Sequence, residues 1–261
     1  MIVGVFVTTA EAVENLPGQL SACISLKTPG NNSRQYPLTF LESASGKGCF
    51  SLEASQELPL VITERVRNQS DCWEMEVTLT ALDDIYFNFS QQFSTSFRHG
   101  DCQFYMPGFW YRQNLRSPQG APAFHTSDSW EVREDRLSTP LTGIYNVKDG
   151  QYLTVIRKDE FCHDALTTHS EGEVILSGKT SIGFTGFANH NGKATLSFGF
   201  PYREAPKSYV RKLTLAPEVE AYQKLGKGET VMLTWEIAYG SSDDFSGFVR
   251  SIVTTCTDRS P

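Results

Sequence analysis

Alternation of apolar and polar residues is the feature of this 261-residue chain that most limits its possible folds. From Trp73 to Ala81 the odd positions up to Leu79 are apolar, and the even positions are Glu or Thr. Residues 230–239 repeat the pattern, with Leu233 and Trp235 among the apolar positions. A period of two residues is typical of a β-strand with one buried face and one wet face. We therefore predict a strand in each segment.

Two dipeptides predict tight turns between further strands. Asp149-Gly150 and Asn191-Gly192 each stand between two apolar runs rich in β-branched and aromatic residues. Such dipeptides accept the positive φ angles that a two-residue hairpin turn requires. Both segments are therefore predicted to be antiparallel hairpins.

Shorter apolar runs raise the predicted total to about 14 strands. Because no helices alternate with these strands, the pattern favours an all-β fold, a large two-sheet antiparallel β-sandwich. The further predicted strands are residues 2–8, 19–27, 48–53, 59–67, 84–90, 92–98, 103–106, 174–178 and 210–215.

The closing segment, from Ser241 onward, reads as an amphipathic helix. A Ser suits its N-cap, acidic residues occupy its first turn, and its apolar positions follow one helical face. Such a face must be covered, and the chain stops a few residues later. We therefore expect residues 1–240 to be the β domain and residues 241–261 to begin a linker whose apolar face lies on a missing domain. The apolar positions are Phe245, Phe248, Val249, Ile252, Val253 and Cys256.

Composition limits the partners of this chain. The net charge is −7, from 23 basic and 30 acidic residues, so a nucleic-acid backbone would meet a repulsive surface. No apolar run approaches the ~20 residues of a membrane-spanning helix. Neither a nucleic-acid partner nor a membrane partner is expected.

No motif predicts a cofactor, a metal or a nucleophile. The chain has no Gly-rich phosphate loop and no G-x-S-x-G elbow. Cys162, His163, Asp164 and His169 resemble a metal cluster in composition, but their spacing matches no zinc signature. The six cysteines form no C-x-x-C pair, which favours buried thiols and leaves disulfides and the compartment open.

The alternation fails between residues 107 and 140, a stretch rich in Pro, Trp and Arg. A loop of more than ~15 residues inside a compact domain is uncommon and often functional. Aromatic faces beside charged groups suit sugar rings, which are apolar on their faces and polar at their edges. The alternative is that these aromatic residues fill the sandwich or seal an interface. The predicted carbohydrate contacts are Phe109, Trp110, Tyr111, Arg112, Trp130, Arg133 and Arg136.

Three runs together resemble the N-terminal supersandwich domain, a galactose-mutarotase-like fold, of bacterial glycoside hydrolases. They are F-Y-M-P-G-F-W-Y-R at 104–112, W-E-V-R-E-D-R-L-S-T-P at 130–140 and W-E-I-A-Y-G-S-S-D-D-F-S-G-F-V-R at 235–250. In such enzymes this domain precedes a six-hairpin (α/α) toroid that holds the acid and base carboxylates. The resemblance covers roughly residues 60–261 and places no catalytic residue on this chain.

The resemblance implies a non-catalytic domain that packs against the toroid and whose 107–140 loop reaches the rim of the sugar pocket. Two alternatives stay open. A free-standing carbohydrate-binding module or lectin would bind sugar alone and fold its terminal helix on its own sheet. A mutarotase-like epimerase would need a His, such as His125, His163 or His190, facing a carboxylate in a cleft.

Overall fold

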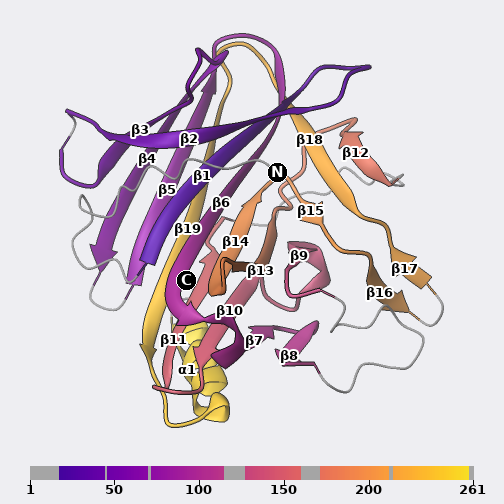
Figure 1. The fold of residues 1–261 in the computed structure, drawn as a ribbon. Helices are drawn as coiled ribbons and strands as arrows, with labels where there is room; N and C mark the ends of the chain where they lie inside the picture. The colour runs from indigo at the N-terminus through magenta and orange to yellow at the C-terminus, as the bar shows by residue number, and fades with distance from the viewer. Residues whose placement is uncertain are drawn as a thin grey trace.

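Antiparallel strands make up most of the computed structural model. It describes residues 18–44, 46–69, 72–114, 127–159, 171–211 and 214–258. Among these residues, one strand pair is parallel, between β12 (Gly172–Ile175) and β18 (Val219–Leu225). The predicted all-β antiparallel class is confirmed (Figure 1).

The first layer of strands faces the viewer in Figure 1. Its central strand is 14 residues long and pairs with a neighbour on each side. In spatial order the layer consists of β2 (Arg34–Glu42), β1 (Gly18–Lys27), β6 (Ile85–Arg98), β14 (Lys193–Phe200), β13 (Phe184–His190) and β9 (Trp130–Arg133).

The second layer lies behind the first and is joined to it through β2. Residues 34–38 of β2 pair with β1, whereas residues 39–42 pair with β3 in the second layer. After β2, the spatial order is β3 (Cys49–Glu53), β4 (Leu60–Gln69), β5 (Cys72–Ala81), β19 (Thr230–Ser241), β11 (Gln151–Arg157), β10 (Leu141–Asn146), β7 (Cys102–Met106) and β8 (Trp110–Arg112).

Shorter elements surround the two layers. They are β15 (Arg203–Glu204), which pairs with β18, the hairpin β16 (Ser208–Arg211) and β17 (Thr214–Ala216), the 3-10 turns η1 (His99–Asp101) and η3 (Glu134–Arg136), and the helix α1 (Phe245–Asp258). No helix in the described part of the chain has the length and apolar character to span a membrane.

Apolar side chains from both layers form the core between them. Phe89 and Phe198 of the first layer pack on Trp235 of the second, with ring centroids 6.4 and 5.4 Å apart. All three side chains are almost fully buried. Burial of this kind, at roughly 25 cal/mol per Å² of apolar surface, is the main contribution that holds the layers together.

One carboxyl group interrupts this core. Glu64 on β4 points between the layers, where its Oε2 accepts a hydrogen bond of 2.6 Å from Gln91 Nε2 on β6. Burial raises the pKa of Glu64 to about 8, although the bond from Gln91 acts in the opposite direction. The carboxyl group is therefore mostly neutral at pH 7.

The local sequence signals placed several elements correctly. The predicted strands at 73–81 and 230–239 are β5 and β19. In the hairpin turns φ is +70° at Gly150, +51° at Asn191 and +82° at Gly192. The predicted strand at residues 2–8 lies outside the described residues, and β2 and β18 were not predicted. The segment 107–140, predicted to be an irregular loop, contains the short strands β8 and β9.

Among the cysteines that the structure describes, Cys23, Cys49 and Cys102 are free thiols. Burial raises the pKa of Cys23 to about 11 and that of Cys102 to about 12. Cys72 is buried, whereas Cys162 and the side chain of Cys256 are outside the described part. Cys23 and Cys102 therefore suit the expected structural role, because a protonated thiol is a poor nucleophile.

The helix α1 forms as predicted but has a different cap. The carboxylate of Asp244 accepts a hydrogen bond of 2.6 Å from the backbone N–H of Gly247, so Asp244 caps the helix in place of the predicted Ser. An acidic side chain here also interacts favourably with the positive end of the helix dipole.

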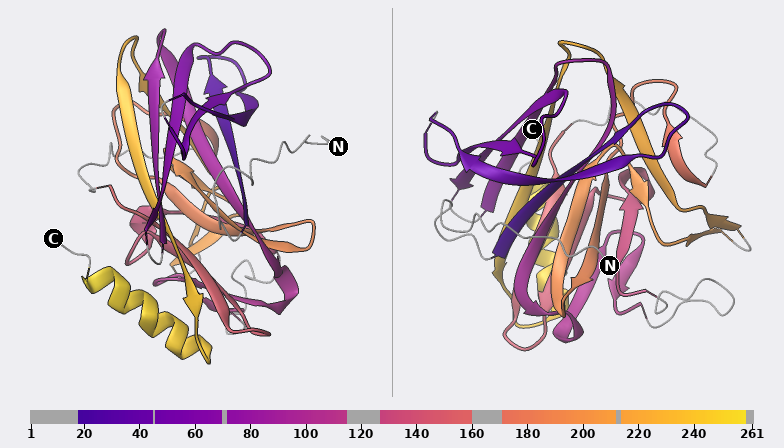
Figure 2. Two further views of the ribbon diagram at one scale, coloured as in Figure 1. Left: turned by 90° about the vertical axis from the view of Figure 1, so that its left-hand side faces the viewer. Right: turned by 45° about the horizontal axis from the view of Figure 1, so that its top comes forward.

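The prediction that this domain leaves the apolar face of α1 uncovered is wrong. Phe245, Phe248 and Ile252 are buried against Leu141 and Tyr145, on the outer side of the second layer (Figure 2). The strand β10 is buried along its whole length, which shows that both of its faces are covered. The part of the apolar stripe that the structure describes thus needs no missing body to cover it; the side chains of Val253 and Cys256 lie outside the described part, and the division of the chain at residue 240 stays a prediction.

Candidate functional site

The two tryptophans of the predicted sugar-contact set are core residues. Trp110 on β8 and Trp130 on β9 are 5% and 1% exposed, and their ring centroids lie 5.4 Å apart. Their indole N–H groups donate to the backbone carbonyls of Arg112 and Ser127. Neither ring offers an open face to a ligand, which matches the alternative that these aromatic residues fill the sandwich.

The arginines that follow are held by neighbouring side chains. Arg133 donates two hydrogen bonds to Asp135, at 2.9 and 2.7 Å. Arg136 pairs with Glu204 and lies 5.3 Å above the ring of the partly buried Phe109. Arg133 thus joins the end of β9 to η3, and Arg136 joins η3 to β15, so both guanidinium groups are engaged within the fold.

Tyr111 and Arg112 are the exposed members of the set. Tyr111 is 50% exposed, and the Arg112 guanidinium lies 5.6 Å from its ring centroid and 5.3 Å from that of Phe245. Arg112 has a φ of +60°, which is uncommon for a residue other than Gly. The described end of the loop therefore lies beside the first residue of α1. Residues 115–126, which include His125, lie outside the described residues.

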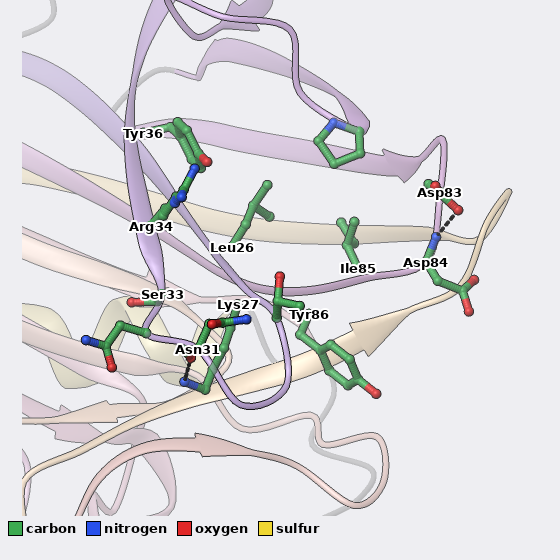
Figure 3. Close-up of a pocket in the computed structure, with 13 residues that line it drawn as sticks. Leu26, Lys27, Asn31, Ser33, Arg34, Tyr36, Asp83, Asp84, Ile85 and Tyr86 are labelled. Atoms are coloured by element: carbon green, nitrogen blue, oxygen red, sulfur yellow. Dashed lines mark hydrogen bonds between the residues drawn. The ribbon is translucent and has the colours of Figure 1, made fainter.

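A cleft that the sequence did not indicate lies at one end of the β1–β2 hairpin (Figure 3). It has a volume of about 760 Å³ and is lined by parts of residues 26–36, by Pro59 and by residues 83–86. We call it the hairpin cleft. Its size is within the range of roughly 300–1,000 Å³ that is usual for small-molecule sites.

The walls of the hairpin cleft differ in chemistry. In Figure 3, Arg34 and Tyr36 lie together on one side and Asp83 lies on the opposite side. Leu26 and Ile85 lie between them and provide an apolar floor. An aromatic ring, an apolar floor and hydrogen-bonding groups at the edges form the combination that a sugar ring requires.

A carboxylate on β12 anchors the hairpin that carries these residues. Glu173 accepts hydrogen bonds from Lys27 Nζ at 2.5 Å and from the backbone N–H of Ser33 at 3.0 Å. Although burial opposes it, these bonds lower the pKa of Glu173. The ion pair compensates the charge of Lys27 and keeps the hairpin against the parallel pair β12–β18.

The opposite wall is fixed through Asp84. Its Oδ1 accepts a hydrogen bond of 2.9 Å from the backbone N–H of Lys227, and its Oδ2 lies 2.9 Å from Lys224 Nζ. The pKa of Asp84 is lowered mainly by the hydrogen bond from the backbone of Lys227 and next by Lys224. Both walls are therefore set before any ligand arrives.

The lining of the cleft combines charged, aromatic and apolar side chains that suit the binding of a small molecule. No His or Cys lines it, and its described residues do not form a nucleophile and base pair. Its residues escaped sequence analysis because they come from a hairpin and a distant turn.

The epimerase alternative gains little from the described residues. His125 and His163 lie outside them, and His190 ends β13 at the Asn191-Gly192 turn. The carboxylates Glu131 and Glu220 flank Arg203, at 3.6 and 2.6 Å. This network shares one guanidinium between two acids, which is typical of a structural ion-pair cluster.

No family model matches the chain, and no curated protein matches it in sequence. Among solved structures, the Slr1438 protein from Synechocystis has a TM-score of 0.46 at 8% identity, over 83% of this chain and 73% of that chain. A putative aldose 1-epimerase from Escherichia coli K12 has a TM-score of 0.42 at 6% identity, over 84% and 79%. The alpha-galactosidase from Lactobacillus brevis has a TM-score of 0.42 at 9% identity, over 86% of this chain and 27% of that chain. Such TM-scores carry no argument about function, which must come from the site.

Proposed function

We propose that this chain is a non-catalytic, carbohydrate-binding β-sandwich domain of a carbohydrate-processing enzyme, of the glycoside hydrolase kind. Because helix α1 packs on the domain's own sheet, the alternative of a free-standing carbohydrate-binding module is kept as a second candidate. The hairpin cleft carries the proposal. It combines the ring of Tyr36, an apolar floor and the hydrogen-bonding groups of Arg34 and Asp83 in a pre-formed depression. A sugar ring would lie over the floor and Tyr36, with its hydroxyl groups directed to the polar walls.

Titration calorimetry of the purified chain against a panel of oligosaccharides tests this function. Binding by the chain alone is expected, and the variant Tyr36→Ala should weaken it at least about tenfold, because stacked aromatic contacts contribute strongly to such sites. The matched control Met232→Ala, at an exposed position of β19, should bind like the wild type. If no oligosaccharide binds to the folded chain, the proposal fails.

A second surface, formed by Tyr111 and Arg112 beside Phe245, is proposed to contact the neighbouring toroid or the rim of its sugar pocket. The exposed ring, the guanidinium stacked on it and the positive φ of Arg112 support this role, because such backbone strain is often found at functional sites. In the whole enzyme, Tyr111→Ala should raise KM or lower stability. If the kinetics and the unfolding of this variant are unchanged, Tyr111 and Arg112 do not have this role. The proposal for the hairpin cleft is tested separately by the calorimetry described above.

A further inference from the structure

Two of the four charged residues that line the hairpin cleft are already in ion pairs. Lys27 is paired with Glu173, and Asp84 is paired with Lys224. Arg34 differs, because no carboxylate in the described part of the chain pairs with it. Its guanidinium is thus the cationic group in the cleft wall that remains available for a ligand.

The backbone beneath Arg34 is fixed. Arg34 pairs with Leu26 across the β1–β2 ladder, and Tyr36 pairs with Ile24, which is fully buried. Arg34 and Tyr36 are two residues apart on one strand, so their side chains leave the same face of the sheet. Figure 3 shows the two side chains together at the edge of the apolar floor. A ligand that rests on Tyr36 therefore has its edge within reach of Arg34.

The opposite wall is less suited to selecting a charged ligand. Asp83 already accepts a hydrogen bond of 2.9 Å at Oδ1 from the backbone N–H of Asp84. Its remaining acceptor capacity suits a sugar hydroxyl group. A guanidinium, by contrast, offers several planar N–H donors, and a carboxylate can accept two of them side by side.

We propose that the hairpin cleft selects an acidic sugar, a uronic acid residue whose carboxylate pairs with Arg34 while its ring lies on Tyr36. This inference rests on the proposed function of the cleft. It adds the class of sugar, and it makes Arg34 the residue that determines specificity.

The test compares two matched probes, oligogalacturonate and its carboxyl-reduced neutral form, by titration calorimetry with the full chain. A charge-assisted pair that is lost from a partly desolvated site should weaken binding by roughly 10- to 100-fold, so the neutral probe should bind that much more weakly. Oligoglucuronate and its reduced form repeat the comparison, because the carboxylate and not the configuration of the sugar is the recognised group.

Variants then assign the effect to one side chain. Arg34→Gln should remove the preference, so that the variant binds the acidic probe and the neutral probe with equal, weak affinity. Arg98→Gln removes the same charge at an exposed position at the far end of β6 and should leave both affinities unchanged. Thermal unfolding of each variant verifies that it is folded, since Arg34 is exposed and its loss should not disturb the core.

The outcomes separate this inference from the function beneath it. Equal binding of the acidic and neutral probes overturns the selection by Arg34 and leaves carbohydrate binding in place. Binding of neither probe, nor of any other oligosaccharide, overturns both. Binding of polyglutamate as tightly as the acidic sugar would also overturn the inference, because the cleft would then recognise a carboxylate without the sugar ring.

Discussion

The buried pair Glu64–Gln91 makes a quantitative prediction about stability and pH. Glu64 is 2% exposed, and the Oε1 atoms of both side chains have no hydrogen-bond partner. Burial raises the pKa of Glu64 from 4.5 to about 8 in the folded chain. The folded protein therefore keeps a proton that the unfolded chain loses above a pH of about 4.5.

The sign and size of the effect follow from this difference. Unfolding releases the proton, so the free energy of unfolding falls as the pH rises from about 4.5 to about 8 and then levels off. A shift of this size corresponds to about 5 kcal/mol in total, of which about 3 kcal/mol is lost by pH 7. A domain whose stability is roughly 5–15 kcal/mol would show such a loss clearly.

Glu64→Gln isolates this contribution. The amide stays neutral at every pH, and its N–H group can donate to the free Oε1 of Gln91, as the neutral acid would. Urea unfolding at pH values from about 5 to 8 should give similar stability for the two proteins at low pH. The variant should be more stable by about 3 kcal/mol near pH 7. The matched control Glu42→Gln, at an exposed position of β2, should follow the wild type.

A second buried acid also makes the free energy of unfolding fall as the pH rises. Burial raises the pKa of Glu134 to about 7, although Arg157 acts against it. Because this contribution is present in the wild type and in Glu64→Gln alike, it cancels in their difference. Parallel profiles for the two proteins would refute the reasoning, since they would mean that Glu64 is ionised within the core or that water reaches it.

Three further predictions concern packing and charge. Phe248→Ala empties the contact between α1 and the second layer and should lower the free energy of unfolding by about 3–5 kcal/mol in urea. Gly186→Ala should cost about 3 kcal/mol or more, because its new Cβ would overlap a backbone carbonyl of β9, whereas Gly100→Ala meets open space and should be neutral by the same measurement. Arg157→Met leaves Glu134 buried without its 2.9 Å partner and should cost about 3–5 kcal/mol, with partial recovery when Glu134→Gln is added, as measured by thermal unfolding.

Local chemistry explains which parts of the fold the sequence predicts. The turn at Asn191-Gly192 forms because these residues accept positive φ, a property that needs no distant partner. The strand β2 escaped prediction because Pro37 and polar neighbours break its alternation. It exists because β1 and β3 pair with it from either side, and such pairing depends on segments that are distant in sequence.

The candidate site also shows the difference between features that the local sequence predicts and features that depend on distant segments. Trp110 and Trp130 were chosen because they stand in an aperiodic segment, where aromatic residues often serve a ligand. Their burial results from long-range packing, since the ring centroid of Trp110 lies 5.0 Å from that of Phe187 on β13. The hairpin cleft depends in turn on the approach of residues 83–86 to the β1–β2 hairpin, which no window of the sequence contains.

The packing of α1 bears on how this domain should be delimited. Gly143 on β10 lies under the Phe248 ring, and a Cβ at this position would come within 2.7 Å of the ring. The outer face of the second layer is thus shaped to receive the helix, and Leu141 and Tyr145 complete the contact. A helix that fills a site on the sheet contributes to the stability of the sandwich whether or not it also leads to another domain. Since Phe245, Phe248 and Ile252 are buried on this sheet, they are not free to contact a neighbour, whereas Tyr111 and Arg112 at the end of β8 are exposed.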